Sequence, residues 1–344
     1  MSKIVRLSLL ILLAALILGG AYLYYRFVAS SAVPPRSEPY YVEIPTGSDF
    51  EEVVKLLKDG GMIKDEGVFR WLADKMQYQK DPMRSGRFRI EPGWSMIDLI
   101  RHLRNGKQDP VQVVLTTERE PENVAAKAAR FIEPDSLELA ALFKDIPYIQ
   151  SLGYTPETLM SLFIPNTYEF YWNTRPREFV DRMVKEHKKF WDQDRRKEKA
   201  AALGLTPAEV YTLASIVEKE TLQNSEKKRM AGVYLNRLKL GMPLQADPTC
   251  VFATRDFNTK RVTDYHTKFD SPYNTYLYKG LPPGPIAMAS ISSLDAVLNA
   301  EQHDYIFFCA KGDGSGLHSF AKTLAAHNKN VEIYRENLRK QGLR

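Results

Sequence analysis

The first block of the hydrophobic pattern is wholly apolar. Residues 7–25 carry no charged side chain, and a helix of about 20 apolar residues is long enough to cross the hydrocarbon core of a bilayer. Lys3 and Arg6 precede the stretch and three tyrosines lie near its end, as basic and aromatic residues do at the two faces of a membrane. We therefore predict a single-pass inner-membrane anchor over residues 1–28, with the bulk of the chain periplasmic.

The same segment also fits a cleaved signal peptide, with a small-residue site near residues 29–32. The apolar run is longer than the hydrophobic region of a usual signal peptide, and this favours the anchor. With either interpretation, the rest of the chain is exported. Residues 29–39 are predicted to be a linker, because they lack periodicity and contain paired prolines that favour an extended spacer.

Residues 40–108 show a strand–turn–helix pattern that occurs twice. Residues 40–45 are strand-like, and a Gly-Ser-Asp turn leads from them into an amphipathic helix. Residues 88–90 form a second predicted strand, followed by a Pro-Gly turn and a helix that ends near residue 105. A further helix is expected around residues 68–76. These elements predict a small, separate α+β module.

Residues 109–205 are expected to form an intermediate, mainly helical region. A strong β run occupies residues 111–116. Apolar residues at helical spacing predict helices over residues 124–131 and 136–143. Residues 179–199 are predicted to form one long charged helix whose surface is exposed to solvent.

Residues 206–344 hold the densest group of unusual residues and are predicted to be the catalytic domain. Thr206 and Pro207 are typical of a helix N-cap and first turn, and the helix they begin is expected to reach about Thr221. Residues 242–285 are rich in Pro, Asn, Tyr and Gly and too long for an idle loop, so they are either functional or contain short strands. The fold class is thus α+β, with an anchor, a small module and a larger domain.

Composition narrows the class of protein. The 344 residues are 44% hydrophobic and 26% charged, with a net charge of +6, which fits two or three globular domains and excludes a disordered or polytopic membrane protein. No nucleic-acid motif accompanies the basic residues, so we expect no nucleic-acid partner. Cys250 and Cys309 lack metal-site spacing, and the sequence leaves open whether they pair in an exported protein.

Two candidate catalytic carboxylates lie near the end of the helix that begins at Pro207. Apolar residues between 210 and 217 form one stripe, with Glu218 at one border and Glu220 near the other. A carboxylate at the edge of an apolar face is partly desolvated, which raises its pKa and lets it hold a proton as a general acid. The pattern does not choose between the two, and either glutamate also fits an ordinary solvated position.

The residues around these glutamates suit a carbohydrate. A glycosidase normally needs two carboxylates, for which Glu220 and Asp247 are the candidate partners, whereas a lytic transglycosylase needs one because a hydroxyl of the sugar replaces water. Tyrosines and amides on the proline-braced loops at residues 243–249 and 272–276 can stack on sugar rings and bind their hydroxyl groups. Packed turns without a ligand use the same residue types.

Five blocks of sequence resemble the endolytic murein transglycosylases, the MltG/YceG-like family. The blocks occur in the family's order, at residues 213–221, 234–238, 244–249, 271–276 and 280–286. The similarity covers nearly the whole chain, and the module at residues 40–108 looks like the family's LysM-like module. The intermediate region departs from the family pattern at residues 116–120, at Met160-Ser161 and at Asn166.

This resemblance implies a lyase without a cofactor. It would cut nascent peptidoglycan strands between N-acetylmuramic acid and N-acetylglucosamine, leave 1,6-anhydro ends and so terminate strand elongation. Glu218 would protonate the glycosidic oxygen and then accept the proton of the C6 hydroxyl. The implied cleft residues are Glu220, Asn236, Gln245, Asp247, Tyr273, Asn274 and Tyr276.

The sequence also leaves two other functions open and suggests binding partners. A non-catalytic peptidoglycan-binding membrane protein and a true glycan hydrolase are the alternative functions. An enzyme tethered to the membrane is expected to act beside the penicillin-binding synthases that extrude the strands. The six histidines include no close ligand pair, so we expect no metal.

Overall fold

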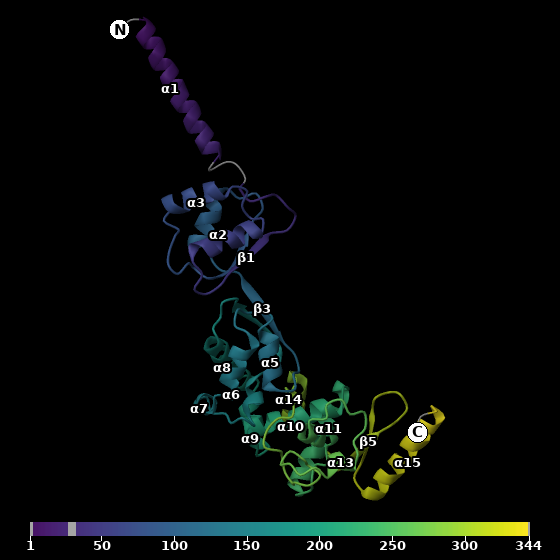
Figure 1. The fold of residues 1–344 in the computed structure, drawn as a ribbon. Coiled ribbons are helices and arrows are strands. Elements are labelled where there is room, and N and C mark those ends of the chain that lie inside the picture. Colours follow the sequence, from purple (N-terminus) through teal and green to yellow (C-terminus); the bar gives the residue numbers. More distant parts are fainter. Residues whose placement is uncertain (1–2, 27–31, 343–344) are drawn as a thin grey trace. The chain divides into compact units, whose positions relative to one another are not determined.

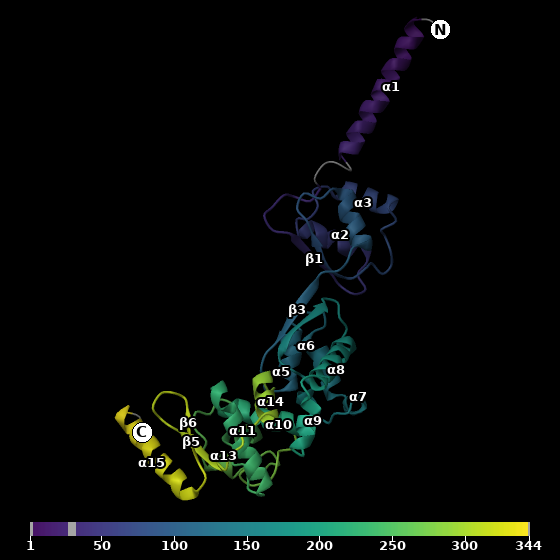
Figure 2. The same cartoon turned by 180° about the vertical axis from the view of Figure 1, so that it is seen from behind.

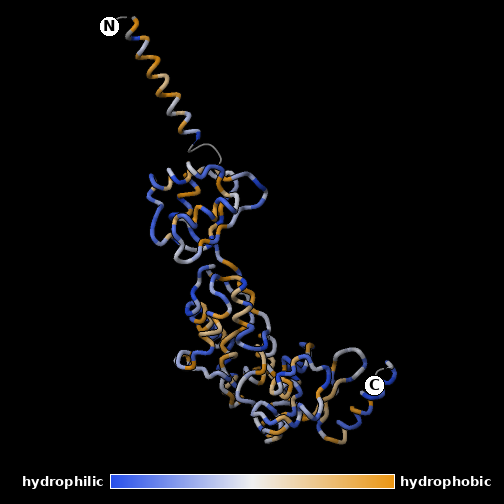
Figure 3. The backbone as a smooth tube through the Cα atoms, viewed as in Figure 1, coloured by the Kyte–Doolittle hydropathy of each residue, from blue (hydrophilic) through white to orange (hydrophobic). Residues whose placement is uncertain are grey.

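The N-terminal segment forms a single apolar helix. The computed structural model describes residues 3–26 and 32–342 of the chain (Figures 1 and 2). Helix α1 (Lys3–Tyr24) contains a 19-residue apolar stretch, and Figure 3 shows hydrophobic residues along most of its length. Its length and hydropathy are compatible with one membrane span, which confirms the predicted apolar helix. Most of the proposed cleavage site near residues 29–32 lies outside the described residues.

The described residues divide into two compact units. Unit 1 comprises those up to Gln112, together with residues 131–133 and 169–174, and unit 2 comprises the others. Residues 134–168 of the expected intermediate region therefore belong to the same unit as the expected catalytic domain.

Unit 1 is a two-stranded sheet covered by helices. Strand β1 (Tyr40–Ile44) pairs antiparallel with β2 (Gly86–Ile90), and alternate residues of both strands are buried because successive side chains of a strand point to opposite faces. The helices are α2 (Phe50–Asp59), α3 (Glu66–Lys75) and α4 (Met96–Asn105). The repeated strand–turn–helix pattern is confirmed, while the likeness to a LysM module stays a prediction.

Part of the expected linker packs on unit 1. The backbone N–H groups of Ala32 and Val33 donate to the carbonyl oxygen of Trp94 at 2.9 and 3.1 Å. Both side chains are buried in the core of the unit. The segment therefore joins the unit from residue 32 onward, and a fully extended spacer over residues 29–39 does not describe it.

Unit 2 is mainly helical. Strand β3 (Pro110–Leu115) pairs with β4 (Asn166–Tyr171), and the division between the units falls within both strands. Strands β5 (Phe307–Ala310) and β6 (His318–Ala321) form an antiparallel hairpin around a glycine-rich turn. The other elements up to β4 are α5 (Pro121–Ala128), α6 (Ser136–Lys144), α7 (Ile146–Ser151) and the short helix η2 (Leu159–Leu162). Those after β4 are α8 (Pro176–Asp192), α9 (Arg196–Ala202), α10 (Pro207–Glu220), α11 (Asn224–Lys239), α12 (Asp247–Thr254), α13 (Asp264–Thr267), α14 (Ile291–Leu298) and α15 (Leu324–Lys340).

The prediction of one exposed helix over residues 179–199 was wrong. Helices α8 and α9 are separated by Asp194 and Arg195, which adopt left-handed backbone conformations with φ of 53° and 55°. The break turns Arg196 inward, where its buried guanidinium contacts the Asp295 carboxylate at 3.1 Å and the Phe190 carbonyl at 3.0 Å. A continuous charged helix would have left this guanidinium in solvent.

Helix α10 is the central helix of unit 2. Thr206 caps it, and the Glu209 carboxylate accepts a hydrogen bond from the Thr206 backbone N–H group. Figure 2 shows α11 and α14 beside it, and α9, α12 and η2 also contact it. Every residue from Val210 to Val217 is buried. The predicted one-sided apolar stripe was therefore too narrow, because neighbours enclose the helix on all sides.

The long segment after α11 is ordered by short helices and by contacts to α10. It contains α12 and α13, and no strand occurs among its residues 242–285. The Ile286 N–H group donates to the Ser215 hydroxyl of α10 at 3.0 Å. At Gly284, the Glu157 carbonyl occupies the place that a Cβ atom would need. This contact explains a glycine there, and it joins the segment to the residues before η2.

Candidate active site

Glu218 lies in the last turn of α10, and one oxygen of its carboxylate is fully engaged. Oε2 accepts hydrogen bonds from Ser293 Oγ at 2.5 Å, from Lys227 Nζ at 3.0 Å and from the hydroxyl of Ser290. The described residues donate no hydrogen bond to Oε1. The side chain is 14% exposed. The carboxylate is thus fixed through one oxygen while the other is available to a ligand.

Lys227 of α11 is the cation that holds this carboxylate. Its side chain is 6% exposed, and Nζ also donates to Ser290 Oγ at 3.3 Å and to Ser292 Oγ at 3.1 Å. An ammonium group has three N–H bonds, so these contacts use all of them. The lysine and the serines were missed from sequence, although Ser290 had a recognisable signal: it caps the helix α14 by accepting from the Ser293 N–H group.

The expectation of a raised pKa for Glu218 was wrong. Burial raises the pKa of this carboxyl group, but the hydrogen bonds from Ser290, Ser293 and Lys227 and the lysine charge outweigh it. The pKa is therefore lowered from its ordinary value, because each of these donors stabilises the charged form. In the free protein Glu218 is an anion.

Glu220 has the property that was expected of Glu218. Its pKa is raised to about 7, mainly by burial; a hydrogen bond from Tyr234 opposes the rise and the charge of Asp247 adds to it. The Tyr234 hydroxyl donates to Glu220 Oε1 at 2.6 Å. Glu218 and Glu220 are only two residues apart in α10. The carboxyl group of Glu218 is nevertheless surrounded by hydrogen-bond donors, whereas that of Glu220 is buried with a single donor.

Asp247 and Tyr276 contact each other directly. Asp247 is the first residue of α12, where the helix N-terminus favours a negative charge. The Tyr276 hydroxyl donates to Asp247 Oδ1 at 2.5 Å. Burial and this hydrogen bond raise the pKa of Tyr276, so the phenol stays protonated and keeps donating.

Two of the three predicted amide residues hold the backbone of unit 2. Asn274 is fully buried, and its Nδ2 atom donates to the carbonyl oxygens of His266, Thr267 and Phe269 at 3.2, 3.1 and 2.8 Å. Asn236 Nδ2 donates to the carbonyls of His303 and Tyr305. These contacts favour a structural role for both asparagines over sugar binding. Gln245 is exposed and has φ of 51°, and its Oε1 atom accepts from Arg237 at 3.4 Å.

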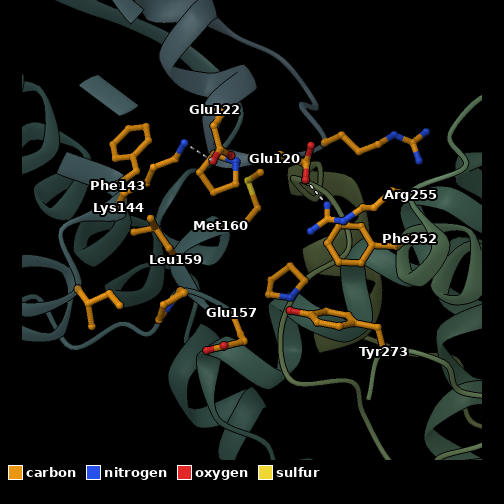
Figure 4. Close-up of a pocket in the computed structure, with 15 residues that line it drawn as sticks. Glu120, Glu122, Phe143, Lys144, Glu157, Leu159, Met160, Phe252, Arg255 and Tyr273 are labelled. Atoms are coloured by element: carbon orange, nitrogen blue, oxygen red, sulfur yellow. Dashed lines mark hydrogen bonds and ion pairs between the residues drawn. The ribbon is translucent and has the colours of Figure 1, made fainter. Parts of the chain in front are cut away.

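Tyr273 lines a cavity of about 370 Å³, which we call the aromatic cavity. Figure 4 shows Phe252 and Tyr273 on one side and Phe143, Leu159 and Met160 on the other. The ring centroids of Phe252 and Tyr273 lie 4.8 Å apart. Ion pairs lie at its rim, between Arg255 and Glu120 and between Lys144 and Glu122. The cavity offers apolar faces bordered by paired charges.

A second cavity, of about 540 Å³, adjoins the catalytic candidates, and we call it the basic cavity. Lys219, the residue after Glu218, lines it together with Asp247 and Arg119. Arg119 also lines the aromatic cavity. Of the predicted site residues, Tyr273 thus lines one cavity and Asp247 the other, while Glu218 is in neither set of lining residues. In the described part of the chain, no group of three or more His, Cys, Asp and Glu side chains is arranged to hold a metal ion.

Comparisons with known proteins agree with one another. The model of the YceG-like family matches residues 42–333. An endolytic murein transglycosylase from Bacillus subtilis (strain 168) is 30% identical over 339 residues, which cover 93% of this chain and 91% of that protein. An endolytic murein transglycosylase from Streptococcus pneumoniae serotype 2 is 28% identical, and the match covers 94% of this chain but 64% of that protein. A crystal structure of a yceG-like protein from Listeria monocytogenes aligns with a TM-score of 0.56 at 27% identity, over 86% of this chain and 99% of that one.

Proposed function

The chain belongs to the YceG-like family, and on that premise we propose that it is a lytic transglycosylase that cleaves the glycan strands of peptidoglycan. The similar proteins from Bacillus and Streptococcus are both named endolytic murein transglycosylase. The Bacillus relative is matched over nearly its full length, which supports carrying the same activity to this chain. A lytic transglycosylase is a lyase, since no water enters the product.

The observation that carries the mechanism is the asymmetry of the Glu218 carboxylate. Oε2 is held by three donors and Oε1 has none among the described residues, so we assign proton transfer to Oε1. It protonates the glycosidic oxygen as the bond from that oxygen to C1 of N-acetylmuramic acid breaks. The C6 hydroxyl oxygen then bonds to C1 and returns its proton to Oε1, which leaves a 1,6-anhydro end. The net reaction moves one proton from the C6 hydroxyl to the leaving oxygen.

Delivery of that proton requires the bound strand to change the surroundings of Glu218. The carboxyl group of the free protein has a lowered pKa, so it begins as a base. A sugar strand that covers Oε1 excludes water, and loss of hydration favours the neutral acid. Once protonated, Glu218 can act first as acid and then as base, as a single-carboxylate mechanism requires.

Glu220 is the competing proton donor, because its pKa of about 7 lets it hold a proton near neutrality. The test compares Glu218→Gln and Glu220→Gln in cleavage of purified sacculi, followed by mass spectrometry of the products. We expect Glu218→Gln to abolish release of anhydro products while strand binding survives, and Glu220→Gln to keep measurable activity. Glu332→Gln, at an exposed position of α15, is the matched control.

The outcomes separate the alternative functions. Reducing ends in place of anhydro ends would identify a hydrolase. Wild-type protein that binds sacculi and releases nothing would identify a non-catalytic wall-binding protein. If Glu218→Gln keeps full activity and Glu220→Gln loses it, Glu220 would be the general acid instead of Glu218.

Helix α1 supports a proposal about the position of the enzyme in the cell. We propose that this helix anchors the chain in the inner membrane, with residues from 29 onward periplasmic, a LysM-like module at residues 40–108 and the catalytic domain from residue 206. Tethering would place the enzyme beside the penicillin-binding synthases as strands emerge. Protease added to spheroplasts should digest the chain, and co-purification should recover a synthase. Recovery of none of the synthases would contradict the partnership.

A further inference from the structure

The basic cavity carries four cations and one carboxylate. Arg119, Lys219, Lys260 and Arg261 line it, and Asp247 is the only acidic residue in its lining. The Asp247 carboxylate already accepts a hydrogen bond from the Tyr276 hydroxyl. The lining is therefore strongly positive beside the residues that we assign to the reaction.

These four cations have no ion-pair partner in the described part of the chain. Arg255, at the rim of the aromatic cavity, differs, because it pairs with Glu120. The guanidinium of Arg119 instead lies over the ring of Phe257, 4.5 Å from its centroid. Unpaired cations around one cavity repel one another, and a bound anion lowers their electrostatic energy, particularly where water is partly excluded.

Lys219 is a half-buried member of the cluster. Burial lowers the pKa of its ammonium group and the charge of Arg119 lowers it further, while Glu218 and Glu118 oppose this from a distance. An anion in the cavity would oppose this lowering, since it stabilises the ammonium form. A partly buried lysine without a close partner is thus consistent with a ligand that supplies the missing charge.

The loop that carries Lys260 and Arg261 is held by hydrogen bonds within the chain. Asp256 receives a hydrogen bond from His266, whose ring is buried, at 3.1 Å. The Thr259 hydroxyl donates to the Arg261 carbonyl at 2.9 Å. These contacts fix the backbone of the loop, from which the exposed side chains of Lys260 and Arg261 extend.

We propose that the basic cavity binds carboxylates of the stem peptide on the N-acetylmuramic acid of a bound strand, an inference that rests on the proposed function. In an intact strand the lactyl carboxyl group of that sugar is consumed by the amide bond to the peptide, so the sugar chain itself is neutral. The peptide carries the free carboxylates. Lys219 lines the cavity and lies within range of the Glu218 charge, so a peptide bound there would keep its sugar in the neighbourhood of Glu218.

The test measures cleavage of two strands by the full chain in detergent. One substrate is the peptide-bearing strand, and the other is the same strand stripped by an N-acetylmuramoyl-L-alanine amidase, which removes the peptide carboxylates and leaves one lactyl carboxylate on each N-acetylmuramic acid. We expect Lys260→Glu with Arg261→Glu to lower kcat/KM about tenfold on the peptide-bearing strand, which corresponds to the loss of about 1.4 kcal/mol. On the stripped strand, kcat/KM should change less than about twofold, or by about 0.4 kcal/mol or less, because the peptide carboxylates that the cavity binds are absent there.

The matched control changes the same number of charges elsewhere. Lys239 and Lys279 are exposed and line neither cavity, so Lys239→Glu with Lys279→Glu should leave both rates unchanged. An equal fall on both substrates with the cavity variant, or no fall on either, would overturn the peptide subsite. An equal fall with the control variant on the peptide-bearing strand would also overturn it, because net charge alone would then account for the effect.

A binding measurement separates this inference from the proposed function. If the wild-type protein cleaves neither strand, the proposed function fails. Calorimetry with the disaccharide that carries its tetrapeptide then tests the cavity independently of cleavage. Weaker binding by Lys260→Glu with Arg261→Glu than by wild type supports the subsite, and equal binding overturns it.

Discussion

Glu218 and Lys227 form an ion pair between α10 and α11 in which both side chains are largely buried. The distance from Glu218 Oε2 to Lys227 Nζ is 3.0 Å, and the side chains are 14% and 6% exposed. A cation this close to a proton-transfer group controls how easily that group takes up a proton. The pair therefore links the packing of two helices to the pH range in which the enzyme can work.

Replacing this lysine should shift the pH profile. In Lys227→Met the burial of Glu218 remains while a hydrogen bond and a positive charge are lost, so the pKa of Glu218 rises. Because the acid form is needed to protonate the glycosidic oxygen, the alkaline limb of the kcat/KM profile should move upward by about one pH unit. Lys227→Arg, which keeps the charge, should leave that limb nearer its wild-type position. An unshifted limb in Lys227→Met would contradict the assignment.

The same pair also contributes to stability, with a defined sign. A carboxyl group whose pKa is lowered on folding stabilises the fold above its ordinary pKa, and this contribution is lost as the pH falls through the lowered value. Urea unfolding should therefore find Lys227→Met less stable than wild type at pH 7, with the difference shrinking toward pH 3. A constant difference at all pH values would attribute the loss to packing alone.

Glu220 should produce the opposite pH dependence. Its pKa is raised to about 7 by burial, so the folded state binds more protons than the unfolded state between the ordinary glutamate pKa and about 7. Stability is therefore lost as the pH rises through this window. Glu220→Gln removes the penalty, and its stability relative to wild type should improve by about 3 kcal/mol between pH 4 and pH 8. If the pH dependence of stability is the same for Glu220→Gln and wild type, with Glu332→Gln as control, the pKa of Glu220 is not raised.

The Tyr276 hydroxyl should matter more than its nearest equivalent on the surface. Tyr276→Phe removes the 2.5 Å hydrogen bond to Asp247 and is expected to cost about 1–2 kcal/mol and to lower kcat/KM. Tyr278 makes a similar bond of 2.6 Å to Asp270, but Tyr278 is exposed whereas Tyr276 is half-buried. Tyr278→Phe should cost less than about 0.5 kcal/mol and leave activity intact. If the two substitutions have equal effects on stability and activity, Asp247 and Tyr276 do not belong to the active site.

Asn274 should behave as a structural residue. Asn274→Ala removes a fully buried amide that donates to three carbonyl oxygens, and we expect it to lower the free energy of unfolding by about 3 kcal/mol or more. Circular dichroism during urea unfolding would measure this. If the variant is as stable as wild type but has a raised KM, the amide binds substrate.

Much of the candidate site could be located from the sequence, because the features that locate it are local. The cap at Thr206 and the apolar residues after it specify a helix through hydrogen bonds and spacing within one segment. That helix places Glu218 and Glu220 near its end, as predicted. The apolar N-terminal helix and the strand–helix repeats of unit 1 were predictable for the same reason.

Tertiary structure alone decided the chemical state of each glutamate. Ser290 and Ser293 are more than seventy residues from Glu218 in sequence, and no periodicity within α10 reports their hydroxyl groups. The buried guanidinium of Arg196 is likewise paired with Asp295, 99 residues away. The sequence by itself thus determined which carboxyl groups stand at the end of α10, since helix formation is short-range. Which of them is an anion and which holds a proton was decided by the folded chain, because a pKa depends on the solvent and charges that distant segments bring to it.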